Sequence, residues 1–345
     1  MSQSFTLALL GLIMLAVLIV PFFVRWIEGH LELFFLVMGV GAALVSRVLD
    51  LALVAGALTA PLKLTAAVLC AGALFKVARR RLRAGIGRLA GRMSFGGFMF
   101  LAVLLVGLLS GVITSVVAAL VLVEIVAALR MDRHHEVFYV VVACFSIGLG
   151  SALTPAGGPV PALLLAALKG DPAAGFFWLF RSFGPFIIPG LAGFGLLAAL
   201  RKGRPSPDAL SAPDDDIGWA DVAARGASIY VFVAALVLLG ASFKPVADAY
   251  LTRVPAPVLY WLNMVSAVLD NATLVAAEAT PALTREQLRD LVMGLSISGG
   301  MLIPGNVPNI ICAGRLKITS REWALIGVPL GLSTMTVYFA VLLLV

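Results

Sequence analysis

Long apolar segments separated by short polar ones make up most of the chain. Runs of about 18 or more apolar residues are long enough to cross the roughly 30 Å hydrocarbon core of a bilayer as helices. Short alternating segments, which are typical of barrel strands, do not occur in the sequence. The pattern predicts an all-α polytopic membrane protein, with apolar segments at about residues 6–24, 31–46, 51–78, 94–130, 137–168, 174–200, 226–243, 255–281, 288–316 and 322–345.

The polar segments predict how the chain is oriented. The stretch 79–92, "RRRLRAGIGRLAGR", is rich in arginine, and the shorter segments 130–133 and 201–204 are also basic. Because Lys and Arg gather in cytoplasmic loops, we expect all three segments to be cytoplasmic in a multi-pass protein of the cell's inner (plasma) membrane. The apolar segment 94–130 then begins and ends on the same side of the membrane, and this predicts a re-entrant hairpin.

Two apolar segments contain sequences that a regular helix does not tolerate. They are "GLGSALTPAGGP" (148–159) and "SISGGMLIPGNVPN" (296–309). Proline removes a helical hydrogen bond, and glycine weakens a helix. We therefore expect broken helices over about 137–168 and 288–316. Irregular backbone at membrane depth is tolerated only where protein buries it or where it lines a wet cavity.

The same order of features occurs twice along the chain. Gly150 and Pro155 align with Gly299 and Pro304. Each half crosses the membrane an odd number of times, so the second half is expected to be inverted relative to the first, as in many secondary transporters. The predicted divisions are N-terminal scaffold spans 1–50, repeat 1 at 51–200 (hairpin about 94–130, broken helix about 137–168), a cytoplasmic linker 201–221, and repeat 2 at 222–345 (hairpin about 255–281, broken helix about 288–316).

Composition narrows the function. Hydrophobic residues make up 61% of the chain and charged residues 12%, against about 25% charged in soluble domains. The net charge of +7 is assigned to the basic loops, so the expected partner is the bilayer and not nucleic acid. No HExxH, GxSxG or Walker motif occurs, and we expect no enzyme activity and no cofactor. Cys70, Cys144 and Cys312 are far apart in sequence and are interpreted as small buried hydrophobic residues.

Two acidic residues lie in the predicted hairpins. Asp270, in "SAVLDNATLVAA" (266–277), would cost about 2.5–3.5 kcal/mol at the bilayer centre, so a functional role is expected. The alternative places it among the lipid headgroups at the end of the hairpin. Glu124, in the first hairpin, is interpreted either as a second proton-carrying group or as a partner of Arg181.

The second break offers oxygen ligands. Its paired glycines, Gly299 and Gly300, allow a close approach of the backbone to a ligand. Freed carbonyls with hydroxyl and amide oxygens suit a small hard cation, whereas helix N-termini would favour an anion. A kinked helix without a ligand is the structural alternative. The side chains that supply these oxygens are Ser296, Ser298, Asn306 and Asn309.

These motifs resemble those of the ion transporter superfamily, which includes NhaD-type sodium/proton antiporters, arsenite permeases and divalent anion/sodium symporters. "SAVLDNATLVAA" is similar to the NhaD-type and arsenite-permease motif, and "SGGMLIPGNVPNI" is similar to the superfamily's glycine-rich motif. The resemblance implies a scaffold, a moving transport domain with elevator-type alternating access, and often a homodimer. The residues to which it points are Ser266, Asp270, Asn271, Thr273, Gly299, Gly300, Asn306 and Asn309, with a possible Na⁺ site at Asp270, Asn271 and Asn306.

The first half departs from this pattern. Ala119 and Leu120 replace the Asp-Asn pair, and "TPAGGP" lacks the expected asparagines. The first half then either binds no ion as strongly or uses other groups. Besides Glu124, these candidates are Thr114, Ser115, Ser146, Gly150, Ser151 and Thr154.

The leading hypothesis is a sodium (or other monovalent cation)/proton antiporter in which Asp270 alternates between a proton and the cation. The alternative is a sodium- or proton-coupled symporter of an organic or inorganic anion. A third hypothesis is a membrane assembly or sensor subunit that transports nothing. Duplicated breaks argue against the third hypothesis, and the absence of Lys or Arg in the breaks argues against the second.

Overall fold

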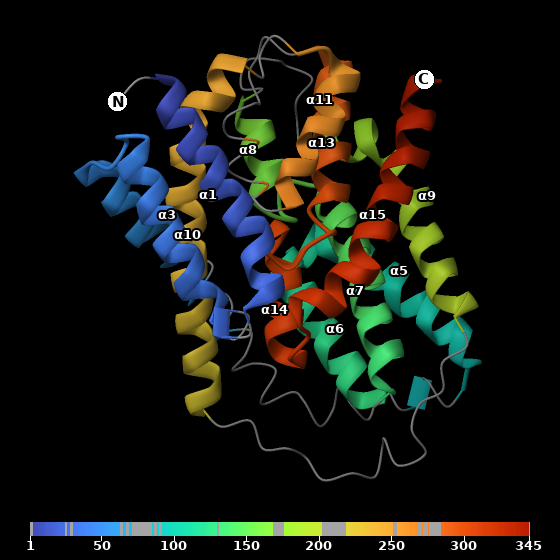
Figure 1. Cartoon of the computed structure of the whole chain (residues 1–345). Helices are drawn as coiled ribbons and strands as arrows, with labels where there is room; N and C mark the ends of the chain where they lie inside the picture. The colour runs from blue at the N-terminus through green and yellow to red at the C-terminus, as the bar shows by residue number, and fades with distance from the viewer. Residues whose placement is uncertain are drawn as a thin grey trace.

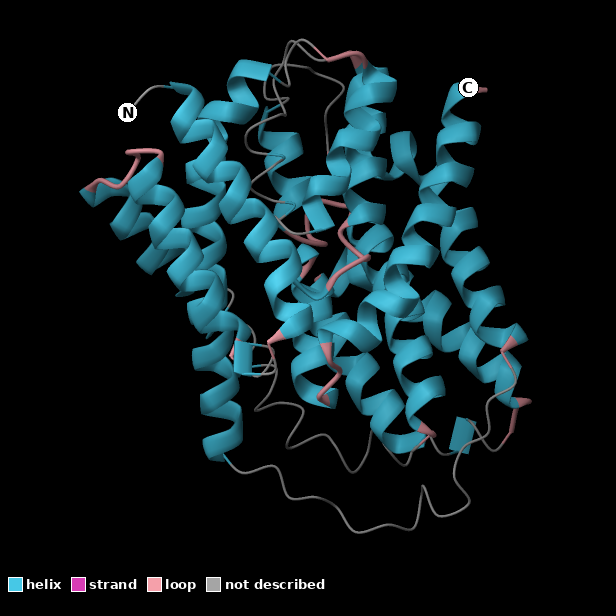
Figure 2. Ribbon diagram, viewed as in Figure 1, coloured by secondary structure: helices cyan, strands magenta, loops and turns pink. Residues whose placement is uncertain are grey.

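A computed structural model describes residues 3–24, 26–27, 30–62, 65–66, 69–70, 85, 88–89, 92–129, 131–167, 176–201, 219–250, 254–267, 271, 275 and 284–344. The described residues form helices joined by turns, and no strand occurs among them (Figures 1 and 2). Four helices are long and apolar enough to cross a membrane: α5 (Phe95–Ile113), α9 (Trp178–Leu200), residues Gly226–Phe243 of α10 (Trp219–Tyr250), and α15 (Ser320–Leu343). The predicted all-helical class is confirmed for the described residues, and these four helices are consistent with a membrane protein.

One group of helices is formed by α1 (Gln3–Phe23), α3 (Leu31–Val45) and α10 (Figure 1). Helices α3 and α10 lie side by side, with the rings of Phe35 and Phe232 4.9 Å apart. A short helix at Leu51–Leu62 joins them, because the Tyr230 hydroxyl donates to the Leu58 carbonyl at 2.7 Å. This group meets the other helices where α1 contacts α15 and α10 contacts α14.

The second group is built on the contact of α5 with α7 (Arg133–Ser151) and α9. Small residues permit close packing of α5 on α7, as is common between helices in membranes. A Cβ atom on Gly111 of α5 would lie 2.8 Å from the Gly150 carbonyl oxygen of α7. Ser110 and Ser146 lie between these helices, and their hydroxyls donate to the carbonyls of Ile147 and Val103 at 3.0 and 2.9 Å.

The segment predicted as the first hairpin contains two helices, α5 and α6 (Ser115–Leu129), which contact each other and meet at Thr114. Thr114 has φ 74°, a conformation that an L-residue adopts at a cost. The amide of Ser115 then donates to the Gly157 carbonyl at 2.9 Å. The second predicted hairpin is described in part, as α11 (Ala256–Leu262), the 3₁₀ turn η2 (Asn263–Ala267), Asn271 and Val275.

Two helices are interrupted at the glycine- and proline-rich sequences. Helix α7 ends at Ser151 and α8 (Pro159–Ala167) follows, while α13 (Arg285–Ser298) ends before the turn η3 (Ile303–Gly305) and α14 (Val307–Leu316). Figure 2 shows loop segments in pink near mid-height among the helices. The two interrupted helices run in opposite directions, because α7 lies below α8 whereas α13 lies above α14 (Figure 1).

The structure differs from the sequence prediction at three points. Helix α7 begins at Arg133, before the expected start near residue 137, because the Asp132 carboxylate caps it by accepting from the His135 amide at 3.3 Å. Helix α10 begins at Trp219, inside the expected linker 201–221, where alanines favour a helix. Cys70 is exposed, so the interpretation of all three cysteines as buried is wrong for this residue.

Candidate functional site

Strong sequence signals define the two helices that flank the second break. Helix α13 begins with a capping box, in which the side chains of Thr284 and Gln287 bond to each other's backbone amides. It ends at Gly299, where the pair Gly299-Gly300 lacks the helix propensity of the preceding residues. Pro308 in the first turn then favours a new start, and α14 begins after Asn306, whose side chain makes no capping bond. The backbone between the two helices is therefore irregular.

Asn309 lies in the first turn of α14 and is fully buried. Its Nδ2 donates to two carbonyl oxygens of the break, those of Gly299 at 2.8 Å and Leu302 at 2.9 Å. These two bonds fix the orientation of the amide. Its Oδ1 has no hydrogen-bond partner among the described residues. A buried acceptor without a partner costs free energy, so this oxygen is a candidate ligand for a bound ion.

Asn271, from the predicted second hairpin, supplies a second oxygen of this kind. The residue is 6% exposed, and its Nδ2 donates to the Leu295 carbonyl of α13 at 3.2 Å. Its Oδ1 also has no partner in the described part of the chain. Two buried amides from different elements therefore each donate from the nitrogen to backbone carbonyl oxygens and leave the side-chain oxygen without a hydrogen bond.

Both amides converge on Gly299. The point where a Cβ of Gly299 would stand is 2.5 Å from Asn271 Nδ2, 3.0 Å from Asn271 Oδ1 and 3.0 Å from the Gly305 carbonyl oxygen. The Gly299 carbonyl itself accepts from Asn309. The absence of a side chain at Gly299 therefore lets the Asn271 amide and the Gly305 carbonyl oxygen pack closely against the backbone of the break. Oxygen ligands of this type suit a small hard cation.

Helix α7 closes one side of this site. A Cβ on Gly148 would lie 3.1 Å from Asn306 Nδ2 and 3.3 Å from the Ser296 carbonyl oxygen. One turn earlier, the Phe145 ring lies against Gly300, where a Cβ would lie 2.7 Å from the ring. On the other side, Trp323 of α15 donates its Nε1–H to the Gly300 carbonyl at 3.0 Å. The last turn of α7 and the second break are therefore in direct contact.

Ser298 attaches the break to η2. Its hydroxyl bonds to the carbonyls of Gly294 at 2.6 Å and Asn263 at 2.8 Å. The Asn263 side chain is 1% exposed, and its Nδ2 is a donor with no partner among the described residues. Ser296 is buried. Ser266 belongs to η2, and Asp270 and Thr273 lie outside the described residues.

The candidates of the first half have a different environment. The hydroxyls of Ser146, Ser151 and Thr154 donate to the carbonyls of Val103, Gly148 and Gly111, respectively. The Thr114 hydroxyl accepts from the Val117 amide at 3.4 Å. No asparagine or other amide side chain lies at this break. The hydroxyls of Ser146 and Thr154 thus attach the first interrupted helix to α5, and those of Ser151 and Thr114 make local bonds, whereas the amides of the second break leave oxygens unbonded.

Glu124 is 4% exposed on α6. Arg181 is exposed on α9, and no described hydrogen bond or ion pair joins the two residues. Both interpretations of Glu124 stay predictions.

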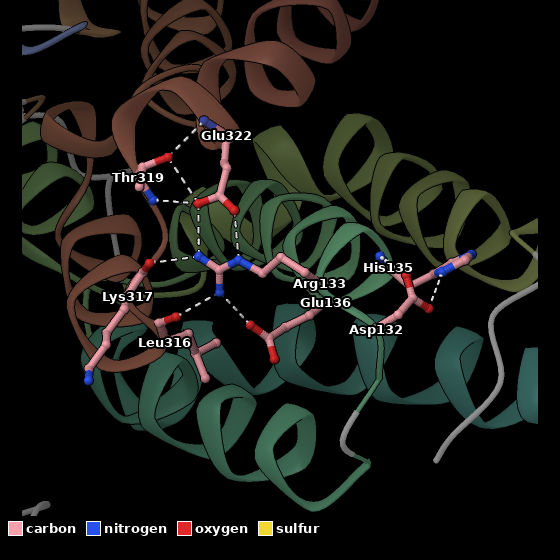
Figure 3. Close-up of polar contacts among 8 residues, drawn as sticks. All are labelled: Asp132, Arg133, His135, Glu136, Leu316, Lys317, Thr319 and Glu322. Atoms are coloured by element: carbon pink, nitrogen blue, oxygen red, sulfur yellow. Dashed lines mark hydrogen bonds and ion pairs between the residues drawn. The ribbon is translucent and has the colours of Figure 1, made fainter. Parts of the chain in front are cut away.

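A second cluster of polar groups lies where α7 begins (Figure 3). Arg133 bonds to both carboxylate oxygens of Glu322, at 2.7 and 2.8 Å, and to Glu136 at 2.8 Å. It also donates to the carbonyls of Leu316 at 2.9 Å and Lys317 at 2.6 Å, at the end of α14. All five guanidinium N–H groups thus have acceptors. Arg133 joins the start of α7, the end of α14 and the start of α15, so α7 and α14 run antiparallel.

The neighbouring residues attach α9 to the same end of α7. Arg201 bonds to the His134 ring, and its guanidinium lies 4.6 Å from the centre of the Phe138 ring. The predicted loops 130–133 and 201–204 therefore begin on the same face of the molecule. Partial desolvation raises the pKa of Asp132, but hydrogen bonds from the His135 ring and amide and the charge of that ring outweigh it, so the pKa lies below its usual value.

Replacement of Arg133 by glutamine is expected to lower the free energy of unfolding by about 1–3 kcal/mol, because charged hydrogen bonds are lost at a partly exposed site. Thermal unfolding in detergent measures the change, with Arg321→Gln, an exposed position on the first turn of α15, as the matched control. In a double-mutant cycle with Glu322→Gln the losses should be less than additive. Equal shifts in the Arg133 and Arg321 variants would contradict the assignment.

Three residues that border the sites described above were not among the site residues predicted from the sequence. Asn263 and Gly305 border the second break, and Arg133 lies at the start of α7. The signal for Arg133 was present, because Asp132 followed by Glu136 is typical of a helix start. No sequence pattern indicates that the Asn263 amide is buried without a partner.

Residues 7–345 match the model of a family described as a protein of unknown function, DUF1646. No curated protein matches the chain.

Proposed function

Since the chain belongs to the DUF1646 family, whose function is unknown, we propose from its own geometry that it is a secondary active transporter that exchanges sodium or another monovalent cation for protons. The observation that carries the proposal is the pair of buried, unbonded amide oxygens of Asn271 and Asn309 beside Gly299. Each oxygen is oriented by its own amide nitrogen, so the site is organised before the ion arrives.

The cation replaces part of its hydration shell with protein oxygens. Asn271 Oδ1, Asn309 Oδ1 and the Gly305 carbonyl are the described ligands. An irregular stretch inside a transmembrane helix is the usual origin of such carbonyls in transporters. Asp270 precedes Asn271 in the sequence, and we propose that its carboxylate supplies the negative charge that a monovalent cation needs in a poorly solvated site.

Proton coupling follows from that same carboxylate. A single acid that binds either a proton or the cation cannot hold both, and this exclusion is what antiport requires. The first half has Ala119 and Leu120 at the equivalent positions. Its described hydroxyls bond to backbone groups, either of α5 or of their own segment, so we assign the exchange to the second half alone.

The arrangement of helices supports an elevator-type movement. Helices α1, α3 and α10 form one group and the interrupted helices belong to the other, with contacts between the groups through α1–α15 and α10–α14. Arg133 joins α7, α14 and α15, which lie within the second group. The opposite directions of the interrupted helices support an inverted-repeat origin.

Anion symport is the competing function. An anion such as a dicarboxylate needs positive groups, and neither break contains Lys or Arg. Of the three unbonded amide atoms described at this break, Asn271 Oδ1 and Asn309 Oδ1 are acceptors, which repel an anion, and one, Asn263 Nδ2, is a donor. The cation function is therefore favoured by the charge and polarity of the site.

The test uses proteoliposomes that contain a pH-sensitive dye and are challenged with Na⁺, Li⁺ or K⁺. The expected result is a cation-triggered proton movement that is lost in Asp270→Asn. In Asn309→Ala the half-saturating cation concentration should rise about tenfold, which corresponds to about 1.4 kcal/mol of lost coordination.

Thr336→Ala, an exposed change on α15 whose hydroxyl bonds only to the Leu332 carbonyl among the described residues, is the matched control and should behave as the unmodified protein. A proteoliposome that takes up a labelled dicarboxylate but shows no proton movement with any cation would contradict the proposal.

A further inference from the structure

Arg201, at the end of α9, is held against the first two turns of α7 by three contacts. Its guanidinium donates from a terminal nitrogen to Nε2 of the His134 ring. The same guanidinium lies 4.6 Å from the centre of the Phe138 ring. The Arg201 carbonyl accepts from the Tyr139 hydroxyl at 2.7 Å. Phe138 and Tyr139 are buried whereas His134 is exposed, so of these three contacts the one with His134 faces water.

The bond between Arg201 and His134 requires a neutral imidazole ring. A guanidinium group has donors and no acceptor, so the ring nitrogen Nε2 has to accept with its lone pair. A second proton on the ring converts both nitrogens into donors. The hydrogen bond is then lost, and two positive charges face each other. Because histidine is the side chain whose charge changes between about pH 5 and 8, this contact responds to pH in that range.

The carboxylates near His134 are already paired with other groups (Figure 3). The Asp132 carboxylate bonds to the His135 ring at 2.6 Å, and the two glutamates of this cluster bond to Arg133. Among the described residues, no ion pair joins a carboxylate to His134. The titratable and charged side chains around this end of α7 are Asp132, Arg133, His135 and Glu136 of α7, Lys317 after α14, Glu322 of α15 and Arg201 of α9.

We propose that the contact between His134 and Arg201 is a pH-sensitive switch that attaches the end of α9 to α7 when His134 is neutral and releases it when His134 is protonated. The sign follows from the hydrogen bond, which needs the lone pair of the neutral ring. The contact is therefore present above the pH at which His134 takes up its proton and is lost below it. The inference rests on this ring and its partner, and it does not depend on the proposed cation exchange.

Release of Arg201 should loosen the last turn of α9. Once the guanidinium is repelled by the charged ring, the Tyr139 hydroxyl and the face of the Phe138 ring remain as its contacts with α7. The backbone amides of the last turn of α9 should then open more often and exchange hydrogen faster. For an exposed contact between polar and charged groups, we expect an increase of about fivefold.

The experiment measures amide hydrogen exchange by mass spectrometry in the full-length protein, at about pH 8 and about pH 5.5, with rates corrected for the intrinsic effect of pH on exchange. The segment followed is the end of α9, residues 195–201. The unmodified protein should exchange about fivefold faster in this segment at the lower pH. Equal corrected rates at the two pH values would overturn the proposal.

Three variants identify the group that responds. In His134→Gln the side-chain oxygen accepts from Arg201 but does not titrate, so the segment should exchange slowly at both pH values. In Arg201→Met no donor remains, and exchange should be fast at both. His135→Gln is the matched control and should keep the acid response, because a protonated His135 still donates to Asp132. An acid response that persists in His134→Gln, or disappears in His135→Gln, would overturn the assignment.

A second measurement needs no variant. The chain has three histidines, so their nitrogen-15 ring signals can be followed in the histidine-labelled protein by nuclear magnetic resonance. At about pH 8 the His134 ring should show an unprotonated Nε2 and a protonated Nδ1, as an acceptor from Arg201 requires. The opposite tautomer, or a ring that is already doubly protonated at this pH, would contradict the proposal.

Discussion

Replacement of Gly299 by alanine is expected to abolish cation-dependent transport in a protein that still folds. The added methyl group would lie 2.5 Å from Asn271 Nδ2 and 3.0 Å from both Asn271 Oδ1 and the Gly305 carbonyl oxygen, which is closer than such atoms pack. The Asn271 amide has to turn away, and its oxygen leaves the proposed cation site. We expect a loss of apparent cation affinity of at least about a hundredfold, equivalent to about 2.7 kcal/mol.

The fold should tolerate this change. Gly299 has φ −59° and ψ −20°, a right-handed helical conformation that alanine adopts readily. Alanine even favours a helix by up to about 1 kcal/mol over glycine, which partly offsets the cost of moving a side-chain amide. Loss of function without loss of folding is therefore the signature that separates a binding site from a packing site.

Gly314→Ala is the matched control. Gly314 lies in α14, and no heavy atom lies within 4 Å of a Cβ built there. The same methyl group is added, but at Gly314 it meets no neighbouring atom. The measurement is the initial rate of cation-triggered proton movement over a range of Na⁺ and Li⁺ concentrations, with size-exclusion profiles for both variants. Wild-type cation dependence in Gly299→Ala would remove Gly299 from the site.

The sequence predicted the class of the molecule because periodicity and length are local properties. The apolar segments became helices, and the glycine- and proline-rich stretches around Gly150 and Gly299 became the interruptions, since proline and glycine act within a few residues. Helix α7 begins earlier than expected because the Asp132 side chain caps its first turn, although the residues around Asp132 are basic. Such capping was visible in the sequence.

The details of the site could not be predicted in the same way. The orientation of the Asn271 and Asn309 amides depends on the backbone carbonyls to which their nitrogens donate. Those of Gly299 and Leu302 lie in the irregular backbone of the break, and that of Leu295 also accepts the helical bond from the Gly299 amide. Residue types indicated the chemistry, but tertiary packing decided which groups keep an unbonded oxygen.

Replacement of Gly150 by alanine is expected to be the most destabilising single change in the interrupted helices. A Cβ on Gly150 would overlap the Gly107 carbonyl oxygen of α5. The obstacle is backbone, so no rotamer change relieves it, and overpacking of this kind costs about 3 kcal/mol or more. The hydroxyl of Ser110, which bonds to the Ile147 carbonyl at 3.0 Å, would be separated from its acceptor as the helices move apart.

The consequence should reach the second break. Gly148 lies one half-turn before Gly150 and contacts Asn306, so a displaced α7 withdraws one wall of the cation site. Thermal unfolding and the monodisperse fraction after detergent extraction measure the effect. Gly193→Ala in α9 is the control, since no heavy atom lies within 4 Å of its Cβ. If Gly150→Ala and Gly193→Ala unfold at the same temperature, then α5 and α7 are not held as closely as the Gly107–Gly150 contact requires, and the α7 wall of the site rests on other contacts.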